Sequence, residues 1–177
     1  MIELLKRWSL PVAVAQICRK QKAFRSSHNY RDAARILIVF TMEGNEKIQY
    51  VRDLQASFEA DGKEVSMLYY LPKPDLASDV HLDQGMERIE QRQIGFFGSI
   101  DHEKARQMLR TEFDFLVHAD LNTSTSIDLL LCLSKARCRI GRHFDGREGF
   151  YELMIEPGPD DQLSGFYRDL YTYTKAL

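Results

Sequence analysis

The feature that most constrains the fold is a continuous run of five apolar residues, Ile36-Leu-Ile-Val-Phe40. Runs of this kind, rich in β-branched side chains, are typical of strands that are buried on both faces, and such strands occur in parallel sheets. Residues 45–61 follow with apolar side chains at helical spacing, and Gly62 suits the left-handed position that ends many helices. A second apolar run over 65–71 completes a strand–helix–strand unit, which is right-handed in nearly all proteins.

The same alternation continues to the end of the chain. Further strands are predicted at 94–97, 113–121, 138–142 and 151–155, and further helices at 102–111, 126–136 and 160–177. Residues 75–93 show no clear pattern. We therefore expect an α/β fold with a doubly wound, mostly parallel sheet of five to six strands, Rossmann-like, in a single domain over 35–177.

Residues 1–34 are predicted to form a basic helical arm, which Pro11 interrupts or restarts. Residues 1–35 hold eight Lys/Arg against two acidic residues, so this segment carries +6 and the remainder −8. A basic arm on an acidic body can contact a protein partner, a second copy, an anionic surface or its own body. Nucleic-acid binding is not expected, because the body is acidic.

The sequence offers no long apolar segment and no metal-binding cysteine pattern. No run approaches the roughly 18 apolar residues of a membrane-spanning helix. The short apolar stretch around Pro11 is unlike a signal peptide, so a cytoplasmic location is expected. The cysteines are odd in number and lack Cys-x-x-Cys spacing, which predicts reduced thiols. They are Cys18, Cys132 and Cys138.

In open parallel sheets, ligands bind outside the carboxyl ends of the strands where strand order reverses. The loop after the first strand, 41–46, has one glycine, so it lacks both the three-glycine dinucleotide loop and the P-loop. No cofactor is therefore predicted, and histidine spacing predicts no metal site. Glu43 and Glu46 either repel a phosphate there or simply stabilise the dipole of the following helix.

The loop after the fourth strand is richer in polar groups. His118 and Asp120 share one strand face at its binding end, as an acid/base pair or as a buried histidine beside a capping aspartate. Residues 122–126 hold four hydroxyls and an asparagine, more than helix capping needs. Arg142 and His143 follow the fifth strand, either as an anion site or as a solvated hairpin tip.

These loops supply the candidate site residues. The weak catalytic candidates are Glu43, Asp120 and His118, and the ligand-binding candidates are Thr41, Asn45, Asn122, Thr123, Ser124 and Arg142. In the last predicted helix, Phe166, Tyr167, Tyr171 and Tyr173 either form an aromatic box or pack against the sheet, and packing is the preferred interpretation.

The stretch Phe113-Asp-Phe-Leu-Val-His-Ala-Asp-Leu121 and, after an apolar helix, Ser134-Lys-Ala-Arg-Cys-Arg-Ile-Gly-Arg142 resemble the N-terminal half of lipopolysaccharide heptosyltransferases. That resemblance implies a glycosyltransferase B half-domain over about 35–142. In those enzymes a Gly-Asp pair after the first strand supplies the catalytic base. The matching pair here is Gly44-Asn45, and asparagine cannot accept the proton; Glu43 is a displaced substitute.

The whole chain is also similar to a small family of uncharacterised bacterial α/β proteins. The shared elements are Phe97-Gly98, the segment 134–142 and the closing Tyr-Glu-Leu-Met-Ile over 151–155. We expect a non-catalytic or degenerate module that binds a small ligand or a protein partner. The alternative is a glycosyltransferase-like enzyme acting on a sugar or phosphosugar acceptor, with Glu43 or Asp120 as base and a donor site from another chain.

Overall fold

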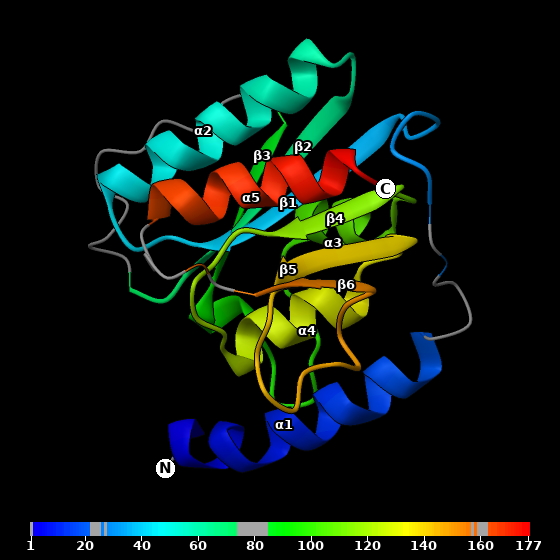
Figure 1. Ribbon diagram of the computed structural model, residues 1–177. Helices are drawn as coiled ribbons and strands as arrows, with labels where there is room; N and C mark the ends of the chain where they lie inside the picture. Colours follow the sequence, from blue (N-terminus) through cyan, green and yellow to red (C-terminus); the bar gives the residue numbers. More distant parts are fainter. Residues whose placement is uncertain (1, 22–25, 27, 74–84, 157, 159–162) are drawn as a thin grey trace.

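The computed structural model describes residues 2–21, 26, 28–73, 85–156, 158 and 163–177. Its centre is a six-stranded sheet with the order β3-β2-β1-β4-β5-β6, in which every neighbouring pair is parallel (Figure 1). The strands are β1 (Arg35–Thr41), β2 (Glu64–Leu71), β3 (Met86–Glu90), β4 (Phe115–His118), β5 (Cys138–Arg142) and β6 (Leu153–Ile155). The predicted doubly wound parallel sheet is confirmed.

Helices cover both faces of this sheet. They are α1 (Ile2–Gln21), α2 (Asn45–Ala60), α3 (Glu103–Arg110), α4 (Thr125–Leu133) and α5 (Leu163–Lys175). Figure 1 shows α2 and α5 on one face, and α4 on the other with α1 outside it. Each face has its own buried apolar cluster, because consecutive side chains of the buried strands point to opposite faces.

Three local predictions are wrong. The third strand is Met86–Glu90, and the predicted 94–97 segment forms only a turn closed by a bridge between Ile94 and Ile100. Three of the five residues of this edge strand are charged, so no continuous apolar run marked it. Pro11 does not divide the arm, since one helix runs through it. The loop after β5 is not a hairpin tip, because β5 and β6 are parallel.

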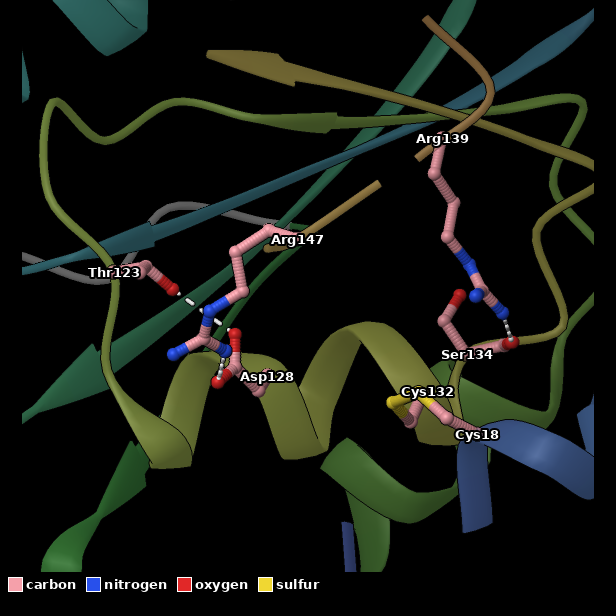
Figure 2. Close-up of a disulfide and its surroundings, with 7 residues drawn as sticks. All are labelled: Cys18, Thr123, Asp128, Cys132, Ser134, Arg139 and Arg147. Carbon is pink, nitrogen blue, oxygen red and sulfur yellow. Dashed lines mark hydrogen bonds and ion pairs between the residues drawn. A yellow bond between two sulfur atoms is a disulfide. The ribbon is translucent and has the colours of Figure 1, made fainter. Parts of the chain in front are cut away.

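The reduced-thiol interpretation is wrong for two of the three cysteines. Cys18 of α1 and Cys132 of α4 form a disulfide, with their Cα atoms 4.8 Å apart (Figure 2). Cys138 lies outside this disulfide and is buried. Sequence spacing could not reveal the bond, because the two cysteines lie 114 residues apart and meet only when α1 packs on α4. The cytoplasmic location stays a prediction.

A cluster of hydrogen-bonded side chains around Asp61, at the amino end of the sheet, is expected to make the stability of the fold sensitive to acid. Asp61 accepts hydrogen bonds from Tyr30 (2.7 Å), Tyr171 (2.9 Å) and Lys175 (2.9 Å). The bonds from Lys175 and then Tyr30 lower the pKa of Asp61 to about 2. A depressed pKa stabilises the fold above the ordinary carboxyl range near pH 4, and this stabilisation is lost as pH falls toward 2.

We expect Asp61→Asn to cost about 1 kcal/mol at pH 7, because water screens this part-exposed site. The variant should also lose stability less steeply between pH 4 and 2, which urea unfolding at several pH values will measure. The matched control is Asp53→Asn, which removes an exposed carboxylate on the same helix. Equal acid dependence in Asp61→Asn and the parent protein would contradict the assignment.

Candidate functional site

The candidate site lies where β1 and β4 run side by side and the chain leaves them in opposite directions. After β1 the chain enters α2 on one face, and after β4 it enters α4 on the other. In the sheet register Val39 lies opposite His118, so the loops that follow both strands meet at one edge. This is the strand-order reversal at which open α/β sheets bind ligands.

Asp120 is the centre of this edge, and it is only 1% exposed. Thr41 donates to it from both its backbone N–H (2.9 and 3.0 Å to the two oxygens) and its hydroxyl (2.8 Å). Lys47 Nζ lies 2.5 Å from Oδ1, and His118 Nε2 lies 3.1 Å from Oδ2. Burial alone would raise the pKa of Asp120, but the interactions with His118 and Lys47 outweigh it and the pKa is lowered. Asp120 is therefore a carboxylate whose two oxygens are both engaged.

A chain of polar contacts runs through this carboxylate. Lys47, itself 4% exposed, also pairs with Glu43 at 2.8 Å, and the Glu43 side chain is half exposed. On the other side, His118 Nδ1 lies 2.8 Å from the Tyr151 hydroxyl. His118 thus lies between the Asp120 carboxylate and the Tyr151 hydroxyl, with one ring nitrogen against each. The order Glu43–Lys47–Asp120–His118–Tyr151 leads from the surface into the core.

Gly141 explains why Tyr151 can reach His118. The Tyr151 ring stacks on the imidazole, with centroids 5.9 Å apart and planes 12° apart. A Cβ atom on Gly141 would lie 2.7 Å from Tyr151 Cε1 and 3.2 Å from His118 Cβ. Burial raises the pKa of Tyr151, so its hydroxyl remains a proton donor. The glycine of the Arg-Ile-Gly-Arg element is thus required by close packing at the site.

We expect Gly141→Ala to lower the free energy of unfolding by about 1–3 kcal/mol, because the added methyl must displace the Tyr151 ring. Chemical denaturation will measure the loss. Gly149→Ala is the control, since a Cβ there meets no atom within 4 Å. A Gly141→Ala protein as stable as this control would show that the ring has room to move.

The structure brings most of the predicted ligand residues to this edge but gives several of them structural partners. Ser124 caps α4 by accepting from Ile127 N (3.3 Å). Thr123 donates to Asp128 (3.0 Å), which also pairs with Arg147 (Figure 2). Arg142 donates to the Leu121 carbonyl oxygen (2.9 Å).

Other predicted positions have less to constrain them. Asn122 is exposed in the loop before α4. Asn45 is the first residue of α2, and its side chain lies outside the described part of the structure. His143 lies to the side of the network, 3.4 Å from Glu156.

Three further residues complete the site: Lys47 and Tyr151 were not among the predicted site residues, and Tyr167 packs in the core as expected. Lys47 was read as part of an ordinary helix, although its position four residues after Glu43 is a known ion-pair spacing. No sequence pattern indicates that Tyr151 belongs to the site, because nothing in the sequence shows that its side chain reaches His118. Tyr167 of α5 donates to the Ala119 carbonyl oxygen (2.8 Å) and stacks on Tyr50 of α2, so both helices are tied to the β4 loop.

The described residues form neither a metal site nor a membrane-spanning helix. Within the ranges that the structure describes, no three His, Cys, Asp or Glu side chains gather in a way that could hold a metal ion. No described helix combines the length and apolar character required to cross a bilayer.

Comparison with solved structures supports the fold. E. coli heptosyltransferase WaaC with ADP-2-deoxy-2-fluoro heptose matches with a TM-score of 0.50 and 14% identity, over 80% of this chain and 48% of that chain. WaaC with ADP matches with a TM-score of 0.51 and 12% identity, over 79% and 46%. The chain thus spans about half the length of these enzymes, and at such identities the likeness shows the fold alone.

Among curated proteins no match is found. The family comparison covers nearly the whole chain. A model described as a family of unknown function, DUF6913, matches residues 6–177, and the chain belongs to this family.

Proposed function

We propose that the protein is a non-catalytic or catalytically degenerate α/β module that binds a small polar ligand or a protein partner at the carboxyl edge of β1 and β4. The observation that carries this proposal is the state of Asp120. Its oxygens already accept from Thr41, Lys47 and His118, and its pKa is lowered. A general base needs an available lone pair and a pKa near the working pH.

His118 is equally committed. It is fully buried, and its two ring nitrogens contact Asp120 and Tyr151. The network therefore supports holding β1, β4 and α2 in fixed relation rather than transferring protons to a substrate. Around it, exposed Asn122 and half-exposed Glu43 offer hydrogen bonds to a hydroxyl-rich ligand such as a sugar or phosphosugar.

One observation favours the alternative, a glycosyltransferase-like enzyme. Glu43 lies in the loop between β1 and α2, and Lys47 fixes its carboxylate while half of the side chain remains exposed. A carboxylate placed this way could act as a base toward a sugar or phosphosugar acceptor. WaaC, whose fold this chain shares over about half of that enzyme's length, has been solved with ADP. The activated donor would then bind another chain.

A thermal-shift panel of sugars, phosphosugars, nucleotides and nucleotide sugars tests the proposal. A ligand at 100 times its Kd stabilises by about 2.7 kcal/mol, or roughly 5–10 °C in Tm at this chain length. We expect a sugar or phosphosugar to raise the Tm of the parent protein and of Glu43→Gln by the same amount. Neither protein should consume a nucleotide sugar. The control is Glu46→Gln, which removes an exposed carboxylate from the same helix start.

One result would decide against the module, and another would exclude a small ligand of the tested classes. Turnover of a nucleotide sugar that Glu43→Gln abolishes and Glu46→Gln retains would establish the enzyme instead. The absence of a shift with every compound would exclude a ligand of these classes and leave the protein partner.

In this proposal the N-terminal arm contacts the partner, which is a second copy of the chain, another protein or an anionic surface. On α1, Val12 and Arg19 are exposed. Light scattering and vesicle sedimentation, with and without residues 1–30, test this role. If the full chain and the shortened chain are both monomeric and neither binds vesicles, the arm does not have this role.

A further inference from the structure

Helix α4 is mostly apolar and is buried on all sides. Its residues Ser126–Cys132 are seven consecutive buried positions, which a helix with one solvent-facing side does not show. The sheet covers one side of α4, and α1 lies against the opposite side (Figure 1). Without α1, apolar surface of α4 would face water.

In the part of α1 whose side chains the structure describes, one strip of the helix provides this cover. Leu10 and Val14 are buried against the cluster on this face, and Ile17 and Cys18 are partly buried one turn further on. Near the start of the strip, the Ser9 hydroxyl donates to the Phe96 carbonyl oxygen (3.0 Å). Pro11 and three β-branched residues within 11–17 lower the intrinsic helix propensity of the segment. The helix is therefore weak on its own, and its stability depends on packing against α4.

The Cys18–Cys132 disulfide lies at the carboxyl end of this strip (Figure 2). A covalent link there keeps α1 beside α4 at a high effective concentration. Cys138 cannot exchange into the bond in the folded protein. Its side chain belongs to the cluster on the other face of the sheet, with α2 and α5.

We propose that this disulfide is a redox switch for the arm: α1 covers α4 while the bond is intact and leaves it when the bond is reduced. The proposal goes beyond the ligand edge and does not depend on it. Release uncovers an apolar strip of α4 and frees a basic segment, so the two states offer different surfaces to a partner.

A dithiol reductant supplies the two electrons. One of its thiolates attacks Sγ of Cys18, which is the more exposed member of the pair, since Cys132 is fully buried. The Cys132 thiolate leaves and takes up a proton. The second thiol then attacks the mixed disulfide, Cys18 leaves as a thiolate and is protonated, and the reductant ends as a disulfide.

Amide hydrogen exchange on the full chain, with and without dithiothreitol, tests the switch. We expect residues 9–19 to exchange at least tenfold faster after reduction, and β1 and β4 to keep their protection. Cys18→Ala should exchange quickly under both conditions. Cys138→Ala is the control and should respond as the parent protein does. Thiol titration in denaturant should count one thiol before reduction and three after it.

Three outcomes would overturn the proposal. Three titratable thiols in protein prepared under oxidising conditions would show that the bond does not form. Unchanged protection of 9–19 after reduction would show that packing alone holds α1. Simultaneous loss of protection in β1 and β4 would show that the bond supports the whole fold rather than the arm.

Discussion

Replacing Asp120 with alanine is expected to lower the free energy of unfolding by about 3–5 kcal/mol, the cost of breaking a buried ion pair from one side. The substitution leaves the Lys47 ammonium inside the protein with Glu43 as its remaining carboxylate partner. It also removes the acceptor for the backbone N–H and hydroxyl of Thr41. Urea unfolding followed by circular dichroism will measure the loss.

A double variant separates the buried charge from the lost packing. Asp120→Ala combined with Lys47→Met leaves no buried charge in the pair, so it should cost less than Asp120→Ala alone. The control is the ion pair of Glu103 and Arg106 on the surface, where Glu103→Ala should leave the free energy of unfolding nearly unchanged. If Asp120→Ala were as mild as this control, or if the two substitutions were additive, Asp120 would not be the central contact of the site.

Acid titration gives an independent check on the same residue. The pKa of Asp120 is lowered in the folded protein, so its stabilisation is present above the ordinary carboxyl range near pH 4 and is lost as pH falls below that range. Asp120→Asn cannot titrate, and its stability should therefore fall less steeply with acid than that of the parent protein. At neutral pH both proteins should show little dependence on pH from this group.

The parallel arrangement of the strands followed from burial, and that part of the fold could be predicted. Residues 36–40 read as a strand buried on both faces, and β1 is fully buried there. Once the sheet is parallel, the end of β1 and the end of β4 must share an edge, which brought His118 and Asp120 beside Thr41. β3 could not be found this way, because three of its five residues are charged, which resembles the composition of a surface loop.

The details of the site depended on contacts between distant elements. Nothing near Lys47 in the sequence shows that it forms a buried ion pair with Asp120, which lies 73 positions later. The surplus of hydroxyl residues before α4 suggested ligand binding, yet Thr123 and Ser124 are used to hold Asp128 and to cap the helix. A local pattern specifies which groups are polar, whereas tertiary packing decides whether they remain available.

Tyr167→Ala is the second large expected effect, with a loss of about 3–5 kcal/mol for a buried aromatic side chain. The ring is buried among α2, α5 and the sheet, and it stacks on Tyr50 with centroids 5.6 Å apart. Tyr167→Phe keeps this ring and removes only the hydrogen bond to the Ala119 carbonyl oxygen, so it should cost about 1 kcal/mol. Denaturant unfolding of both variants will separate ring packing from the hydrogen bond.

The control is Tyr173→Ala on the same helix, where the side chain is about half exposed and the loss should stay within roughly 0.5 kcal/mol. This comparison also decides between the two interpretations of the aromatic residues in α5. If they form a ligand box, Tyr167→Ala should abolish ligand-induced thermal shifts while costing little stability. If they pack the core, the stability loss should come first, and Tyr167→Phe should retain whatever ligand binding the parent protein shows.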